Sequence, residues 1–266
     1  MKKAILGVVL WSLMMLVPVN DATAGPAMDR ILSKGELVVG TSGAQPPMTA
    51  VSKKGEIMGL DADLARTMAD ALGVKASFKI LPFAELLPAL EAGQVDVILS
   101  GMTITPARNR KVAFVGPYLA SGKGILTLSD RFAALQEAQG LNAPEVSIAV
   151  LQASTSQEYA QALMPKATLI PTDSYEAAID LLLRKKADVV VADYPFCALT
   201  AYRYQGKGLL AGKAPLTFEP LGIAMAADPL LINWAQNFMV LLQGSGQLKA
   251  MHQKWLTGGQ WVDQLP

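Results

Sequence analysis

The chain has 266 residues, of which 52% are hydrophobic, and its formal net charge is +1. This length allows one or two domains with a sizeable core, and the near-neutral charge argues against a nucleic acid or an anionic membrane surface as partner. Cys197 is the one cysteine, which excludes an internal disulfide. We therefore expect Cys197 to pack in the core, although an extracytoplasmic compartment would permit disulfides.

Residues 1–24 have the three regions of a secretory signal peptide. Two lysines precede an apolar run that ends at Val17, and small residues at 22–24 close the segment. The run is too short to span a bilayer. We expect cleavage before Gly25, without a lipid anchor because no cysteine lies near that position. Loss of the two lysines and Asp21 changes the formal charge from +1 to 0.

The remaining chain alternates short apolar strands with amphipathic helices, a pattern typical of sheets covered by helices. The first series comprises a strand over 37–41, a Gly- and Pro-rich loop, a helix from about 61, a strand over 77–81, a helix from 83 and a strand over 95–99. A second series follows Gly122, with a strand over 146–150, a helix from 154, a helix over 175–183 and a strand over 189–192. The sequence therefore predicts two small α/β lobes.

The segment 100–108 follows the last strand of the first series and ends in an arginine. The guanidinium of Arg108 matches both oxygens of a carboxylate, and the Thr103 hydroxyl and nearby backbone N–H groups can complete its shell. Ligands of open α/β sheets bind beyond the carboxyl ends of strands, where this segment lies. The alternative is that Arg108, Arg110 and Lys111 form the solvated face of a short helix.

Several short motifs, spread over nearly the whole mature chain, resemble those of one protein family. They are Leu37-Val38-Val39-Gly40-Thr41, the run 59–65, Leu87-Pro88-Ala89-Leu90, Val95-Asp96-Val97, the stretch 103–108, Gly116-Pro117-Tyr118 and Lys254-Trp255-Leu256. In order and spacing they resemble extracytoplasmic solute-binding proteins of the polar amino-acid type, family 3. Members of that family are the receptor components of ABC importers.

The resemblance implies a bilobal fold, the type II periplasmic-binding-protein fold, in which two hinge crossings join the lobes. Lobe 1 would comprise residues 25–122 and 217–266, and lobe 2 would comprise residues 123–216. Ligand would close the lobes, and a permease in the inner membrane would recognise the closed form. We therefore expect a monomeric periplasmic protein, without cofactor, that binds an amino acid or similar small carboxylate.

The resemblance also assigns polar ligand contacts to positions of this chain. Arg108 would hold the α-carboxylate with help from Thr103. The Gly101 carbonyl would accept a hydrogen bond from the α-ammonium, and Asp193 would pair with that ammonium from the other lobe. A structural alternative exists for Asp193, which precedes Pro195 and can cap the following helix.

Three further residues have both a binding and a structural interpretation. Ser154 and Thr155 take the place of a family turn that offers backbone N–H groups to the carboxylate, but they also suit an ordinary helix cap. Phe83 would form the apolar wall of the pocket. Because it opens the apolar stripe of its helix, core packing explains it equally well.

The loop 42–50 departs from the family pattern. Gln45 stands where a ring often covers the ligand, Met48 and Ala50 replace aromatic residues, and Ser42 stands where relatives often carry an acid. A cationic ligand side chain would need a carboxylate there. We therefore expect a neutral or acidic ligand. Lys123 and Glu85 are further polar residues whose side chains the sequence does not place.

Two other function classes stay open. A cyclohexadienyl or arogenate dehydratase-like enzyme shares this fold, and Glu85, Glu158 and Glu219 are its acid/base candidates here. The second class is a ligand-sensing module for a membrane receptor. The single histidine, His252, lies on the last predicted helix, so no metal site or Ser-His-Asp set is expected. We assign no catalytic residue.

Overall fold

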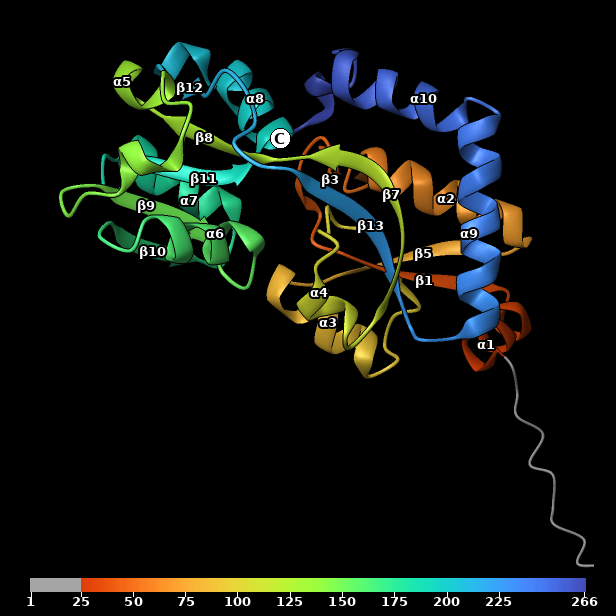
Figure 1. The fold of residues 1–266 in the computed structure, drawn as a ribbon. Coiled ribbons are helices and arrows are strands. Elements are labelled where there is room, and N and C mark those ends of the chain that lie inside the picture. The colour runs from red at the N-terminus through yellow and green to blue at the C-terminus, as the bar shows by residue number, and fades with distance from the viewer. Residues whose placement is uncertain (1–24) are drawn as a thin grey trace, which may run out of the picture.

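The computed structural model describes residues 25–266. The predicted signal peptide, residues 1–24, lies outside the described residues. Two mixed five-stranded sheets, each covered by helices, lie side by side (Figure 1). This arrangement confirms the predicted α/β class.

The first sheet has the strand order β5-β1-β6-β13-β7. β1 is parallel to β5 and β6, whereas β13 is antiparallel to β6 and β7. Its strands are β1 (Glu36–Thr41), β5 (Lys75–Ile80), β6 (Val97–Ile98), β7 (Ala113–Ser121) and β13 (Glu219–Met225). The strand predicted over 95–99 is shorter here because the Val38 amide donates to the Asp96 carboxylate (2.8 Å). We call this sheet and its helices the first body.

The helices of the first body bury one apolar face against its sheet. In α2 the fully buried Leu64 and Met68 lie one turn apart, and the helix ends at Gly73, whose φ of +71° suits glycine. The helices are α1 (Pro26–Lys34), α2 (Leu60–Leu72), α3 (Phe83–Glu91), α4 (Pro106–Asn109), α9 (Pro229–Gly244) and α10 (Gln247–His252). A π-helical segment η3 (Gln253–Thr257) and a short η4 (Val262–Gln264) follow α10.

The second sheet has the strand order β10-β9-β11-β8-β12. β9 is parallel to β10 and β11, and β8 is antiparallel to β11 and β12. Its strands are β8 (Lys123–Thr127), β9 (Ser147–Leu151), β10 (Thr168–Thr172), β11 (Val189–Asp193) and β12 (Leu210–Ala211). Its helices are α5 (Asp130–Ala133), α6 (Thr155–Leu163), α7 (Tyr175–Leu183) and α8 (Tyr194–Arg203), with short segments η1 (Ala138–Leu141) and η2 (Gln205–Lys207). We call this sheet and its helices the second body.

A third, small antiparallel sheet lies in the segment expected to be a Gly- and Pro-rich loop. It comprises β2 (Ala44–Gln45), β3 (Thr49–Val51) and β4 (Ile57–Met58). The loop prediction was wrong here because the backbone closes into a hairpin around Pro46 and Pro47, with Gln45 paired to Thr49. The hairpin fixes the position of Gln45 beside the site described below.

Two chain segments connect the bodies, between β7 and β8 and between β12 and β13 (Figure 1). They approach each other at Gly122, where an added Cβ would lie 2.1 Å from the Thr217 carbonyl oxygen. Only glycine fits this position without displacing the neighbouring backbone. The amide of Lys123 also donates to the Thr217 hydroxyl (2.9 Å).

The run 59–65 and the C-terminal motif Lys254-Trp255-Leu256 of the resemblance lie in contact. The Asp63 carboxylate of α2 accepts hydrogen bonds from Lys254 Nζ (2.6 Å) and Trp255 Nε1 (2.8 Å). Trp255 is buried in the core of the first body. Cys197 is fully buried among apolar residues of α7 and β11, as predicted. No helix within residues 25–266 is long and apolar enough to cross a membrane.

Candidate functional site

Polar side chains from both bodies meet where the strands end and the two sheets face each other. Thr103 and Arg108 come from the segment after β6. Asp193 ends β11, Thr155 begins α6 and Lys123 begins β8. All five are buried, with Thr155 the most exposed at 9%. We call these five residues the polar cluster.

Arg108 contacts both bodies. Its Nη1 donates to the Thr103 carbonyl (3.1 Å) within the first body, and its Nη2 donates to the Ala153 carbonyl (3.3 Å) in the second. The ring of Phe83 lies 5.8 Å from the guanidinium carbon. The alternative of a solvated face is wrong for Arg108, which is 8% exposed, although it holds for the neighbouring Arg110.

The Arg108 cation is buried without an acidic partner. Burial lowers its pKa, and more distant carboxylates such as Glu158 counteract this only in part. In the part of the chain that the structure describes, no carboxylate lies within ion-pair distance of it. A buried cation held only by carbonyls is well placed to bind an added carboxylate.

Asp193 does not cap the helix that follows it. It occupies the N-cap position of α8, yet its side chain accepts no hydrogen bond from that helix. Its Oδ1 accepts from Lys123 Nζ (2.8 Å) and its Oδ2 accepts from Gln45 Nε2 (2.6 Å). The capping alternative is therefore wrong, because the carboxylate turns into the polar cluster.

Gln45 joins the two bodies at this point. Its amide nitrogen contacts Asp193, and its Oε1 would lie 2.8 Å from a Cβ added to Gly101. Gly101 has a φ of +62°, a conformation that favours glycine. Its N–H donates to the Asp61 carboxylate (2.6 Å). The Gln45 side chain, 2% exposed, thus packs between Gly101 and Asp193.

Ser154 and Thr155 lie at the N-terminus of α6. The Ser154 hydroxyl caps the helix by accepting from the Gln157 amide (3.3 Å), which confirms the structural interpretation of this residue. The Thr155 hydroxyl accepts from Lys123 Nζ (2.7 Å) and lies 3.3 Å from the Thr103 hydroxyl of the first body.

A cavity of about 260 Å³ lies between the two bodies, and none of its lining residues belongs to the polar cluster. Phe83 connects the two, because it lines the cavity and its ring lies 5.8 Å from the Arg108 guanidinium carbon. Ser42 and Phe83 line it from the first body, and Asp173, Ser174 and Tyr175 line it from the second. Phe83 also packs in the apolar core, so both of its interpretations are compatible with its position. The backbone N–H of Ser42 donates a hydrogen bond to Ser100 Oγ (2.9 Å).

Asp173 changes the expectation about the ligand side chain. That expectation depended on the absence of an acid at Ser42, but the exposed Asp173 of the other body is among the residues that line the cavity. The residue lies in the connection between β10 and α7, where no motif marks it. A cationic ligand side chain is therefore no longer disfavoured by the charges around the cavity.

Sequence reasoning left Lys123 and Glu219 without a place in the site. Lys123 is 1% exposed and binds Asp193 and Thr155, and Glu219 Oε2 lies 3.5 Å from its Nζ. The available signal was a lysine at the start of the apolar run that forms the buried strand β8, because a buried ammonium requires acidic partners. Of the other proposed acid/base residues, Glu85 and Glu158 are exposed.

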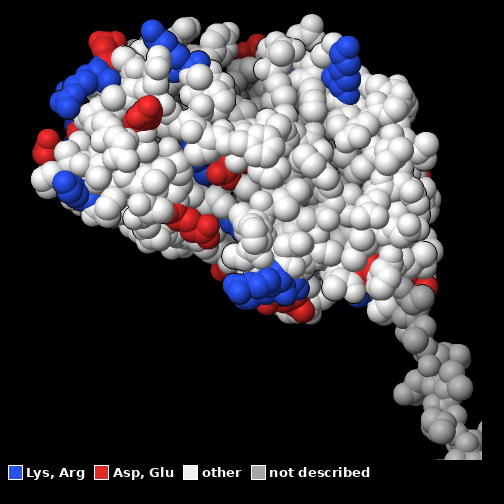
Figure 2. All heavy atoms as spheres, in the orientation of Figure 1, with Lys and Arg blue, Asp and Glu red and all other residues white. Residues whose placement is uncertain are grey.

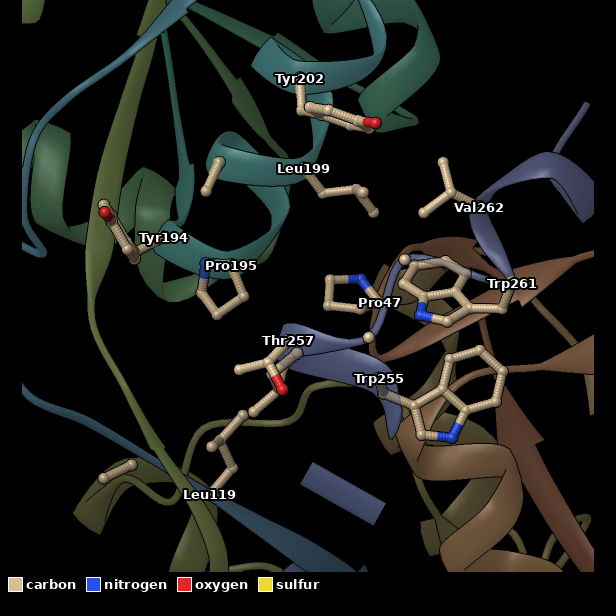
Figure 3. A pocket seen from close by; sticks show the side chains of 15 residues that line it. Pro47, Leu119, Tyr194, Pro195, Leu199, Tyr202, Trp255, Thr257, Trp261 and Val262 are labelled. Carbon is tan, nitrogen blue, oxygen red and sulfur yellow. The ribbon is translucent and has the colours of Figure 1, made fainter. Parts of the chain in front are cut away.

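A larger cavity of about 480 Å³ is lined by residues that closely follow Gln45 and Asp193 in the chain, among them Pro47 and Tyr194. Figure 3 shows Pro195 and Leu199 of α8 on one side and Pro47 and Trp261 on the other. Its lining is mostly apolar and includes no member of the polar cluster. It therefore offers no group that fixes a charged ligand.

The visible surface carries basic and acidic side chains that are interspersed, with wide uncharged areas (Figure 2). Within residues 25–266 no group of three or more His, Cys, Asp or Glu side chains is arranged to hold a metal ion.

Residues 37–258 match the family of bacterial extracellular solute-binding proteins, family 3. The chain belongs to this family. Among curated relatives, the cyclohexadienyl dehydratase of Pseudomonas aeruginosa is 25% identical over 229 residues, with 86% of this chain and 85% of the relative covered. The ABC transporter arginine-binding protein 1 of Escherichia coli is 26% identical over 220 residues, with 81% and 88% covered.

Solved structures of the family are similar over almost their full length. The ancestral amino acid-binding protein AncCDT-1, a precursor of cyclohexadienyl dehydratase, is 34% identical, with a TM-score of 0.79 and coverage of 86% of this chain and 99% of that one. A binding component of an ABC transporter from Wolinella succinogenes, complexed with lysine, is 31% identical, with a TM-score of 0.82 and the same coverage. The family member described here therefore has the fold of two-lobed amino-acid binding proteins.

Proposed function

We propose that this protein is the extracytoplasmic receptor of an ABC importer, and that it encloses an amino acid or similar small carboxylate between its two bodies. The observation that carries the proposal is Arg108, a buried cation without an acidic partner among residues 25–266 that contacts both bodies. A ligand carboxylate would replace its weak contacts with the Thr103 and Ala153 carbonyls by charge-assisted hydrogen bonds.

In this proposal the two bodies are the two lobes of the receptor. Lobe 1 comprises residues 25–122 and 217–266, lobe 2 comprises residues 123–216, and the crossings beside Gly122 act as the hinge. The close approach of the crossings at Gly122 supports this division. The contacts of Gln45 and Arg108 with the second body would form when the lobes close.

The site of ligand binding comprises the polar cluster and the adjacent cavity. Arg108 and Thr103 bind the carboxylate together with the N-terminus of α6 at Ser154 and Thr155. The rest of the ligand extends along Phe83 and Ser42 into the cavity of about 260 Å³. Gly101 and Gln45 line the site from the first body.

Known relatives support the class of protein and its compartment. The family is extracellular, and the arginine-binding relative of Mannheimia haemolytica is periplasmic. The signal peptide predicted in residues 1–24 would deliver a monomer to the periplasm, and an inner-membrane permease would receive its ligand. Most curated relatives are named as binding proteins, which supports a non-enzymatic role despite the dehydratase among them.

The test is a thermal-shift panel of the mature protein against amino acids, dicarboxylates, 2-oxo acids and prephenate. A ligand at about 100 times its dissociation constant adds roughly 2.7 kcal/mol to the stability of the folded state. We expect a narrow group of carboxylates to raise the melting temperature. A flat panel would contradict the proposal, and aromatic product formed from prephenate or arogenate would support the dehydratase class instead.

The variant Arg108→Ala identifies the site. We expect it to fold and to bind the panel's ligand about 10- to 100-fold more weakly, because a charge-assisted hydrogen bond is worth roughly 1.5–3 kcal/mol. The matched control is Arg110→Ala, which removes an exposed guanidinium from the same turn and should leave affinity unchanged. Equal affinity in both variants would remove Arg108 from the site.

A further inference from the structure

Lys123 occupies the position beside Asp193 where an amino acid would place its α-ammonium. Its Nζ donates to Asp193 Oδ1 at 2.8 Å and to the Thr155 hydroxyl at 2.7 Å. Glu219 Oε2 lies 3.5 Å from the same nitrogen. With 1% of its surface exposed, the lysine is as buried as the core residues around it. Its charge is therefore part of the site and not of the solvated surface.

The pair is built into one body and does not depend on lobe closure. Lys123 in β8 and Asp193 in β11 are direct neighbours across an antiparallel strand pair, and Thr155 begins a helix of the same body. By contrast, the Gln45–Asp193 contact joins the two bodies. Separation of the bodies would release Gln45 but leave the ammonium of Lys123 on the Asp193 carboxylate.

An α-ammonium would meet a like charge at this carboxylate. It could replace the Gln45 amide at Oδ2, but Lys123 Nζ would still hold Oδ1 of the same group. Two ammonium groups beside Asp193 repel each other, since a protein interior screens charge poorly. Glu219, whose Oε2 lies 3.5 Å from Lys123 Nζ, is the second carboxylate near them. Lys123 cannot move away cheaply, because its departure would leave Asp193 and Glu219 buried without a cation.

Lys123 instead presents a hydrogen-bond donor to the ligand. An ammonium has three N–H groups, and two of them are accounted for by Asp193 and Thr155. The Glu219 oxygen, at 3.5 Å, makes no hydrogen bond of good geometry among the described residues. A ligand atom next to the carboxylate should therefore be an acceptor, whereas an amino acid places a donor there.

We propose that the site selects small carboxylates that carry an oxygen acceptor, and no ammonium, on the α-carbon, with 2-oxo acids as the representative class. This inference rests on the proposed function, in which Arg108 binds the carboxylate. Arg108 would hold the two carboxylate oxygens, and Lys123 would donate to the α-oxygen. Asp193 then serves to hold Lys123 and does not contact the ligand's α-substituent.

Matched ligand pairs test this with the unmodified mature protein. Isothermal titration would compare L-glutamate with 2-oxoglutarate, L-phenylalanine with phenylpyruvate, and L-arginine with 5-guanidino-2-oxopentanoate. In whichever pair binds, we expect the 2-oxo acid to have an affinity about tenfold or more above that of its amino acid. The reason is that the amino acid leaves a buried donor unpaired.

Equal or tighter binding of the amino acid would overturn this inference and leave the proposed function standing. Absence of binding by these ligands and by the whole thermal-shift panel would overturn the proposed function itself, and this inference with it.

The variant Lys123→Met shows whether the lysine is responsible. It keeps an unbranched side chain, one atom shorter, and removes the charge, so we expect the affinity ratio of 2-oxo acid to amino acid to fall by about tenfold or more. A general loss of structure would weaken the binding of both ligands alike and leave this ratio unchanged. An unchanged ratio would overturn the assignment of Lys123 as the donor. The control Lys249→Met removes an exposed ammonium from α10 and should retain the ratio.

If Lys123→Met does not fold, the double variant Lys123→Met/Glu219→Gln removes one of the two acids that the lysine neutralises. The same ratio is measured, and circular dichroism confirms folding of each variant. The comparison of ligand pairs in the unmodified protein decides the inference in either case.

Discussion

Asp61 is a carboxylic acid in an environment that favours its neutral form. The residue is fully buried, and its Oδ2 accepts from the Gly101 N–H at 2.6 Å. Its Oδ1 has no hydrogen-bond partner among residues 25–266. Burial raises the pKa of Asp61 to about 7, and the Gly101 N–H offsets this only in part. One side chain at the edge of the site therefore titrates near neutral pH.

This raised pKa predicts the direction of a pH effect on stability. Between about pH 4 and pH 7 the folded state holds a proton on Asp61 that the unfolded chain has released. The contribution of Asp61 to the free energy of unfolding therefore falls as the pH rises through this window, by roughly 1.4 kcal/mol per pH unit, and then levels off. We expect Asp61→Asn to lose this component, because its amide is neutral and still accepts from Gly101.

Urea denaturation of both proteins at pH 5 and pH 8 measures the difference. The wild type should lose more stability between these values than Asp61→Asn. Parallel losses in the two proteins would mean that Asp61 ionises at an ordinary pKa in the folded state.

At the level of single residues, the sequence and the resemblance together predicted which side chains meet. Arg108, Thr103, Thr155 and Asp193 lie in one cluster, although they come from segments far apart in the chain. The role of Lys123 could not be predicted, because it depends on the register between β8 and β11, strands about 70 residues apart. A pattern of apolar residues identifies each strand but not which residues lie opposite each other.

Among the secondary-structure elements, α1 and α9 share one capping residue. Asp228 Oδ2 accepts from the amides of Ala27 (2.6 Å) and Met28 (3.2 Å) at the start of α1. Its Oδ1 accepts from the Leu231 amide (2.9 Å) at the start of α9. One carboxylate, 2% exposed, thus satisfies free N–H groups of two helices and fixes the N-terminal helix to the first body.

We expect Asp228→Ala to destabilise the protein by roughly 2–4 kcal/mol, since it leaves buried amides of two helices unpaired. Ser174→Ala is the matched control, because Ser174 caps only α7, with one hydrogen bond to the Ala177 amide. Loss of that cap should cost about 1 kcal/mol. Chemical denaturation compares the two variants, and a similar cost for both would show that the contact with α1 adds nothing.

The boundaries of helices agree with those expected from the sequence where an apolar periodicity or a capping residue marks them. The predicted helix over 175–183 agrees with α7, and α6 begins directly after the capping Ser154. No alternating apolar pattern marked β2 and β3, and both were expected to be loop. Strands of two or three residues are too short for an alternating pattern, and the hairpin is stabilised instead by its pairing with β4 and by the Thr41–Thr49 hydroxyl contact (2.7 Å).

For the whole molecule, three hydrogen bonds and one ion pair at the site join the two bodies. The hydrogen bonds are Gln45 to Asp193, Arg108 to the Ala153 carbonyl, and Thr103 to Thr155. The ion pair is Lys123 to Glu219. The C-terminal segment adds a contact at the periphery, where Arg203 of α8 donates to the Pro266 carbonyl oxygen (2.5 Å). The Gln45 hydrogen bond is the shortest of these contacts, and its acceptor is the Asp193 carboxylate.

Gln45→Ala should therefore shift the ligand-free protein toward an open arrangement. The change removes a charge-assisted hydrogen bond worth roughly 1.5–3 kcal/mol, while the Lys123–Asp193 pair within the second body stays intact. A two-state equilibrium between closed and open forms moves about tenfold for each 1.4 kcal/mol.

Small-angle X-ray scattering should give a larger radius of gyration for Gln45→Ala than for the wild type. The control Gln236→Ala, at an exposed position of α9, should match the wild type. An unchanged radius in Gln45→Ala would show that the other contacts alone hold the bodies together, and it would assign Gln45 to packing against Gly101 instead of to closure.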